Sequence, residues 1–133
     1  MDQNLLRQRE AKCVQEEPPG CTTACPVHVD VRGIVDAIRK NDYKTGLLLF
    51  NKVVPFPRII SRICDQVCQK GCKRKEIDEA IAVNALERIC VDNMGEPKAS
   101  SMAIKAKKDR VAVIGGGLSG LTAALELAKK GYL

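Results

Sequence analysis

The densest group of cysteines in this sequence lies in the segment Arg62-Ile-Cys-Asp-Gln-Val-Cys-Gln-Lys-Gly-Cys72. Cys64, Cys68 and Cys72 follow one another at steps of four residues, so a helix over this segment would carry all three thiols along one side. Gly71 allows the backbone to leave helical geometry just before the last of them. We therefore predict that the three thiols bind around a common centre.

A fourth ligand has to come from elsewhere in the chain, and the best candidate is Cys25, which Pro26 follows directly. A cysteine before a proline, far in sequence from a tight trio, is typical of iron–sulfur ligation. Zinc is the alternative, because structural zinc takes cysteines in close pairs. Two such pairs are present, Cys21 with Cys25 and Cys64 with Cys68. A cubane cluster takes one thiolate at each iron corner, so a trio with one remote partner favours the cluster over zinc.

The composition is that of a globular chain with a small aliphatic core. Of its 133 residues, 29% are charged, 45% are hydrophobic and 3% are aromatic, and an internal metal cluster would help to stabilise such a core. Residues 1–12 are polar and no apolar run is long enough to span a membrane, so we expect a cytoplasmic protein. It has seven cysteines, and those at close regular spacing are then expected to be metal ligands and not disulfides.

The formal net charge is +6, and two basic runs at 70–75 and 105–110 contribute to it. No nucleic-acid-binding motif or aromatic stacking platform accompanies these runs, so a nucleic-acid partner is not expected. The first run, which includes Lys73, Arg74 and Lys75, is expected to offset the negative charge of a thiolate-bound cluster or to face an acidic partner.

Apolar periodicity and capping residues predict a mainly helical domain before residue 95. Asp30 and Asp78 are expected to cap two of its helices. Pro18 and Pro19 predict an irregular segment around the first three cysteines. A helical hairpin would then return the chain from Cys25 to the cysteine trio. The predicted helices span residues 2–12, 31–40, 43–53 and 79–94.

The last part of the chain changes character. A buried-type strand is predicted over 110–114, a helix over 121–130, and Gly115-Gly-Gly-Leu-Ser-Gly120 lies between them. This is a G-x-G-x-x-G motif between a strand and a helix, the context in which such glycines bind the pyrophosphate of a dinucleotide. The sequence ends where a second strand should begin, so we expect the start of a Rossmann domain from a longer protein. The predicted cofactor-binding residues are Gly115, Gly117 and Gly120.

Jointly these motifs resemble the N-terminal region of the small (beta) subunit of bacterial glutamate synthase and the similar region of dihydropyrimidine dehydrogenase. The resemblance covers nearly the whole chain. It implies an α-helical ferredoxin-like 4Fe–4S domain over 1–94, a linker over 95–109, and a truncated first β-α unit of a Rossmann FAD domain over 110–133. The motifs that carry it are Cys13, Cys21 and Cys25-Pro26, the trio of cysteines, Leu86-Glu87, and Val113-Ile-Gly-Gly-Gly-Leu-Ser-Gly120.

The resemblance also implies ligand sets for two 4Fe–4S clusters. Glu16 replaces a cysteine of the second set, and carboxylate is a harder and weaker ligand for a cluster than thiolate. We therefore expect one cluster to be present and the second to be lost or labile. The first set is Cys25, Cys64, Cys68 and Cys72, and the second is Cys13, Glu16, Cys21 and Glu87. Cys90 matches no ligand and is expected to be a buried helix residue.

The parent protein implied by the resemblance is an NAD(P)H-dependent oxidoreductase that contains FAD. The fragment would have no catalytic residue of its own, and its cluster would relay electrons between the flavin of its own C-terminal domain and a partner subunit or domain. Two alternatives remain at this point. One is a zinc-stabilised helical interaction module without a redox role, and the other is a docking domain that has lost its cluster.

Overall fold

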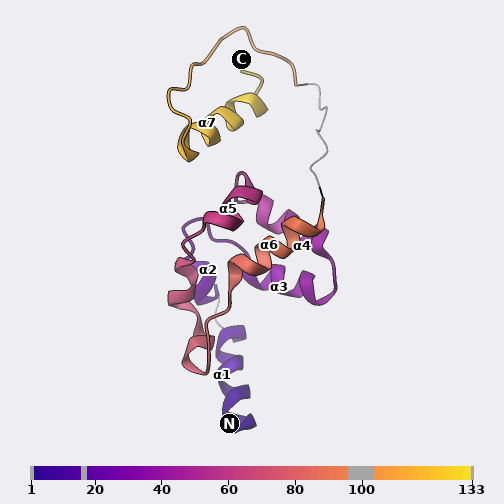
Figure 1. The fold of residues 1–133 in the computed structure, drawn as a ribbon, viewed down its shortest axis with the longest axis vertical. Helices are drawn as coiled ribbons and strands as arrows, with labels where there is room; N and C mark the ends of the chain where they lie inside the picture. Colours follow the sequence, from indigo (N-terminus) through magenta and orange to yellow (C-terminus); the bar gives the residue numbers. More distant parts are fainter. Residues whose placement is uncertain (1, 16–17, 96–103, 133) are drawn as a thin grey trace. The chain divides into compact units, whose positions relative to one another are not determined.

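The computed structural model describes residues 2–15, 18–95 and 104–132, and it divides into two compact units, Met1–Glu96 and Pro97–Leu133. The described residues form helices and turns, and none of them forms a β-strand. No helix among them is long and apolar enough to cross a membrane. The first unit contains α1 (Gln3–Gln15), α2 (Gly20–Ala24), α3 (Val31–Arg39), α4 (Tyr43–Asn51), α5 (Pro57–Ile63) and α6 (Val83–Asn93), with the 3-10 turns η1 (Val67–Gly71) and η2 (Lys73–Glu76) (Figure 1).

The helical hairpin of α3 and α4 is confirmed, and aspartates begin both helices. The side chain of Asp30 accepts a hydrogen bond from the backbone N–H of Gly33 at 2.9 Å, and Asp42 accepts one from the N–H of Thr45 at 3.0 Å. Both bonds satisfy donors that a helix start otherwise leaves unpaired. Asn41, with φ of 56°, turns the chain between the two helices, which pack against each other.

The core of the first unit lies where α3, α4, α5 and α6 meet. Ile34, Phe50 and Val91 fill it with aliphatic and aromatic carbon. Helices α4 and α6 approach each other closely, since a Cβ on Gly46 would lie 2.5 Å from Sγ of Cys90. Cys90 is 0% exposed, so the prediction that it is a buried helix residue is confirmed.

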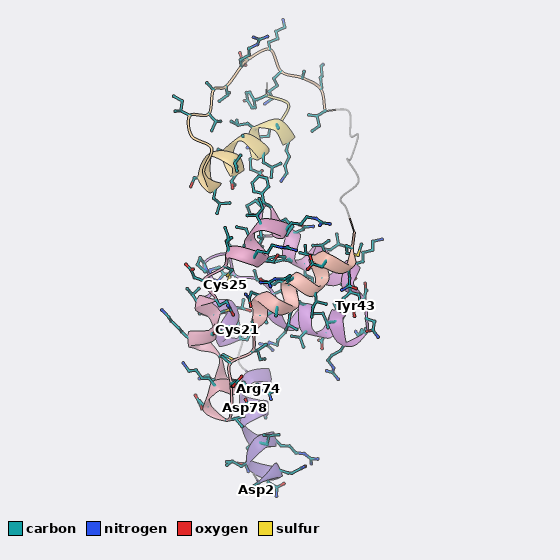
Figure 2. All side chains as sticks on the ribbon, in the orientation of Figure 1. Asp2, Cys21, Cys25, Tyr43, Arg74 and Asp78 are labelled. Atoms are coloured by element: carbon teal, nitrogen blue, oxygen red, sulfur yellow. The ribbon has the colours of Figure 1, made fainter. Side chains whose placement is uncertain are left out.

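The helix predicted over 79–94 begins later than expected, at Val83. Asp78 does not cap it, because its carboxylate accepts hydrogen bonds from Nε and Nη2 of Arg74 at 2.9 and 2.7 Å (Figure 2). The residue before the helix is Ala82, which has no side chain that could serve as a cap. The end of the helix is as predicted, since Gly95 follows it with φ of 64°.

The cysteine segment is not one helix, and this corrects the prediction from its four-residue spacing. Cys64 is the C-cap of α5, Gln66 turns the chain with φ of 54°, and Cys68 lies in the separate 3-10 turn η1. Cys72 caps the end of that turn. The three thiols therefore come from a bent segment that curves around a centre.

Three further boundaries differ from the predictions. The segment around Cys21, predicted to be irregular, contains the short helix α2, and α1 continues to Gln15. Helix α5 is not among the predicted helices, because a proline often ends a helix. Proline is nevertheless favoured in the first turn of a helix, because the N–H groups there have no acceptor within the helix. Pro57 begins α5 in this way.

The second unit contains α7 (Leu118–Lys129), which confirms the predicted helix and starts it three residues earlier. Residues 110–114, predicted to be a strand, have no regular secondary structure. A strand needs a neighbour for its backbone hydrogen bonds, and the described residues of this unit provide none. The N–H of Lys107 donates to the carbonyl of Gly131 at 2.7 Å, and its ammonium lies 4.1 Å from the ring centre of Tyr132.

Candidate iron–sulfur site

Two cysteine-bearing segments meet through a contact between glycines. A Cβ on Gly71 would lie 2.5 Å from the carbonyl oxygen of Gly20, so η1 and α2 approach more closely than any other residue at position 71 would allow. Helix α2 packs directly against η1 at this point. Figure 2 labels Cys21, in the first turn of α2, and Cys25, at its end. The contact therefore brings the first cysteine group to the later trio.

A hydrogen-bonded turn fixes the position of Cys25. Its N–H donates to the carbonyl of Thr22 at 3.2 Å, and its own carbonyl accepts from the N–H of His28 at 3.0 Å. The hydroxyl of Thr22 donates to the carbonyl of Val29 at 2.9 Å. Nδ1 of His28 lies 3.1 Å from the carbonyl oxygen of Thr22. In the tautomer with a proton on Nδ1, the ring donates a hydrogen bond to this oxygen. The cysteine before Pro26 is thus held by backbone on both sides.

Backbone N–H groups point at two of the thiols. The N–H of Gln66 donates to Sγ of Cys64 at 3.4 Å, and the N–H of Ile81 donates to Sγ of Cys72 at 3.5 Å. Hydrogen bonds to sulfur stabilise the thiolate form, and they are among the features that set the potential of iron–sulfur clusters. Both donors belong to loops, and the spacing of the cysteines does not predict them.

Cys68 lies at the centre of the group and is 7% exposed. Burial is the largest of the effects that raise the pKa of its thiol to about 11, and the neighbouring groups of Cys64, Glu87, Cys25 and Cys21 contribute the rest, in that order. Three thiols and one carboxyl, from α2, α6 and the end of α5, thus lie near enough to Cys68 to act on its charge. A thiolate here requires a strong positive partner such as iron.

Glu87 projects from α6 into this region and is 5% exposed. Burial raises the pKa of its carboxyl to about 7. Cys72 is also 7% exposed, and a small pocket between α2 and η1 is lined by Cys72 and Cys21 together with Val31, Ile81 and Val83. Cys72 thus lies beside Cys21, and it is not among the groups that act on the charge of Cys68.

Two predicted ligands are not placed by the structure. Cys13 lies in α1, but its side chain is outside the described part of the chain, and so is Glu16. The predicted cofactor glycines, Gly115, Gly117 and Gly120, lie in the second unit, whose position relative to the cysteines is not defined. The described residues contain no group of three or more His, Cys, Asp or Glu close enough to hold a single metal ion.

The donor set fits an iron–sulfur cluster. Soft thiolates from separate segments are the ligands that such clusters take, and none of the four cysteines predicted for the first cluster forms a disulfide. Ser61 on α5 adds a second indication, because its hydroxyl is buried and has no partner among the described residues. The one signal for it in the sequence is a small polar residue three positions before Cys64, in a stretch of isoleucines and arginines.

Comparison with known proteins extends over most of the chain. Residues 1–99 match the family model described as dihydropyrimidine dehydrogenase domain II, 4Fe-4S cluster. The NADPH-Fe(3+) oxidoreductase subunit beta of Geobacter sulfurreducens is 31% identical over 114 residues, which are 84% of this chain and 17% of the relative. The NADP(+)-dependent formate dehydrogenase subunit beta of Moorella thermoacetica is 27% identical, over 84% of this chain and 19% of the relative. The NAD-dependent dihydropyrimidine dehydrogenase subunit PreT of Salmonella typhimurium is 29% identical, over 96% of this chain and 32% of the relative.

The chain thus spans 17% to 32% of the length of these relatives. The part of the predicted resemblance that concerns dihydropyrimidine dehydrogenase is confirmed, whereas the likeness to the glutamate synthase small subunit stays a prediction. Because the matching family model is described with a 4Fe-4S cluster, the match does not favour a zinc-stabilised module. Because the match covers residues 1–99, the chain belongs to the family described as dihydropyrimidine dehydrogenase domain II, 4Fe-4S cluster.

Proposed function

We propose that this chain is the electron-relay domain of a longer, NAD(P)H-dependent flavin oxidoreductase, and that Cys25, Cys64, Cys68 and Cys72 hold one 4Fe–4S cluster. The contact between α2 and η1 carries this proposal, because it joins the two cysteine groups within a segment that matches a 4Fe–4S family. The named relatives, which are subunits of oxidoreductases that use NAD or NADP, support the role of the longer protein.

A 4Fe–4S cluster supplies reversible one-electron transfer when it is bound. The residues of the chain provide its setting. The turn after α2 holds the Cys25 thiol, and α5 and η1 hold the other three. The N–H groups of Gln66 and Ile81 stabilise negative charge on two of the sulfurs. Burial of Cys68 and Cys72 excludes water from the reduced centre.

We further propose that a second cluster is lost or labile. The thiol of Cys21 acts on the charge of Cys68, and Glu87 is buried beside it, which supports a position for both near the first cluster. Cys13 would be the remaining thiolate. With Glu16 in place of a cysteine, a second cluster would have two thiolates and two carboxylates, and hard oxygen ligands match such a cluster poorly.

The glycine motif of the second unit is proposed to bind FAD in the longer protein. Gly115 has φ of 108°, and a Cβ on Gly120 would overlap the carbonyl oxygen of Gly115. Both positions therefore require glycine, as expected where a tight turn leads into the N-terminus of a helix that faces a pyrophosphate. The strand before this motif would form only beside the neighbouring strands of a complete sheet.

The electron partner is proposed to be another subunit or domain, as the names of the relatives suggest. A cytoplasmic location is proposed because the four cysteines proposed to bind the cluster form no disulfide, as is usual in reducing compartments.

Anaerobic reduction tests the relay function. We expect the chain, loaded with iron and sulfide, to bleach in the visible region when dithionite is added and to recover its colour on reoxidation. The reduced form should show an electron paramagnetic resonance signal of one unpaired electron. A chain that binds iron and sulfide but does not accept and return an electron would contradict the proposal.

A further inference from the structure

The hydroxyl of Ser61 is the one buried side-chain polar atom among the described residues that has no hydrogen-bond partner. Ser61 lies on the face of α5 that packs against α6 and is 0% exposed. Burying a hydroxyl without a partner is unfavourable, so such groups are rare in folded proteins and call for an explanation.

The usual partner of a helical serine does not explain it. A serine in a helix commonly bonds the carbonyl three or four positions earlier. Here the carbonyl of Arg58 accepts from Nη1 of Arg62 at 2.8 Å instead. The backbone carbonyl of Ser61 itself accepts from Nη2 of Arg88 at 3.4 Å, which holds α5 against α6 but leaves the hydroxyl without a partner.

The position of Ser61 on α5 relates it to the candidate cluster. Residues three positions apart lie on the same side of a helix, so Ser61 and Cys64 share a side of α5. The opposite side of the helix carries Ile59 and Ile63, which are 47% and 62% exposed. The hydroxyl is therefore directed to the interior of the unit, where α6 also brings Glu87.

We propose that the Ser61 hydroxyl donates a hydrogen bond to a sulfur of the 4Fe–4S cluster held in part by Cys64, and that this bond raises the reduction potential of the cluster. The inference rests on the proposed function. Reduction adds negative charge to the sulfurs, so a donor stabilises the reduced form more than the oxidised form. Ser61 would be a positioning residue that tunes the relay without ligating iron.

Thr122 provides a control. Like Ser61, it carries a hydroxyl within a helix, here α7. Unlike Ser61, it already donates its hydroxyl proton to a backbone carbonyl, that of Leu118 at 2.8 Å, and it belongs to the second unit, which contains no proposed cluster ligand. Thr122→Val should therefore leave the potential unchanged.

The experiment is a potentiometric titration of the full chain, loaded anaerobically with iron and sulfide and followed by electron paramagnetic resonance. Iron and sulfide are assayed in every sample. We expect Ser61→Ala and Ser61→Gly to keep the wild-type iron content and to shift the potential downward, whereas Thr122→Val should keep the wild-type potential.

The outcomes separate this inference from the proposed function. If wild type and Ser61→Ala hold the same cluster at the same potential, the inference is wrong and the relay function stands. An equal shift in Thr122→Val would also overturn it, because the effect would then not be specific to a hydroxyl beside the cluster. Failure of both Ser61 variants to load would make Ser61 a packing residue and reject the inference. A wild-type chain without iron and sulfide would reject both proposals.

Discussion

The contact between Gly71 and Gly20 offers the sharpest test of how the cysteine site is assembled. Gly71→Ala adds one methyl group at the point where η1 touches α2. That methyl carbon would lie 2.5 Å from the carbonyl oxygen of Gly20 and 3.3 Å from Cβ of Ala24. Because the first neighbour is backbone, it cannot rotate away, and the two segments have to separate.

The structure sets the size of this effect. A Cβ atom does not lie closer than 3.0 Å to an atom that is not bonded to it. The added methyl group therefore forces η1 and α2 apart by roughly 0.5 Å or more. Overpacking of this kind costs about 1–3 kcal/mol, which lowers the folding equilibrium constant between about 5-fold and about 150-fold. The same displacement pulls Cys25 away from Cys68, so cluster loading should fall as well.

The assay compares iron and sulfide content and the melting temperature of wild type and Gly71→Ala after anaerobic loading. Gly95→Ala is the control, because Gly95 has φ of 64° and no atom within 4 Å of the added methyl. A left-handed alanine costs about 1–2 kcal/mol, so this control loses stability at a site without cysteines and should keep its iron. Full loading of Gly71→Ala at the wild-type melting temperature would refute the close contact.

Three further predictions concern single side chains. Cys25→Ser should reduce iron and sulfide to a small fraction of wild type in metal analysis, whereas Cys90→Ala should keep the iron and lose about 1 kcal/mol in chemical denaturation; equal iron in both would show that Cys25 is not a ligand. Asp30→Ala removes the bond to the N–H of Gly33 and should cost about 1 kcal/mol in urea titrations without changing iron content; an unchanged midpoint would deny the cap. Burial raises the pKa of Glu87 from its ordinary value of 4.5 to about 7. Because the unfolded carboxyl ionises first, the chain before cluster loading should lose up to about 3 kcal/mol as the pH rises from about 4.5 to about 7, and Glu87→Gln should abolish that dependence; a slope that persists would assign it to another group.

The helices with clear caps and apolar faces could be predicted from the sequence. Asp30 begins α3 and Gly95 ends α6 where the pattern placed them, because a cap is a local interaction between neighbouring residues. Asp78 was misleading for the same reason. Its carboxylate has a competing local partner in Arg74, and no rule of spacing shows which partner it takes.

The sequence predicts candidate cysteines for the site but not the backbone conformation that carries them. The thiol spacing suggested one helix, whereas Gln66 adopts φ of 54° and divides the segment into α5 and η1. A left-handed glutamine has no sequence signal. The role of Gly71 was also misjudged, because the reason for a glycine there is the backbone of Gly20, some fifty residues earlier in the sequence.

The strand predicted over 110–114 shows the limit of a local pattern in another way. Its residues have the apolar character of a buried strand, but a strand is completed by the backbone of its neighbours. Helix α7 satisfies its own backbone and is formed as predicted. Between them, Gly115 has φ of 108° and its carbonyl oxygen packs tightly against Gly120.

The central claim is that Cys25, Cys64, Cys68 and Cys72 hold one 4Fe–4S cluster. Iron, sulfide and zinc content together with a visible spectrum, measured on the chain purified without oxygen, tests it most directly. We predict about four irons and about four sulfides per chain, and a broad absorbance in the visible region that bleaches on reduction. About eight of each would mean that Glu16 or Glu87 serves a second cluster. One zinc without sulfide would contradict the claim.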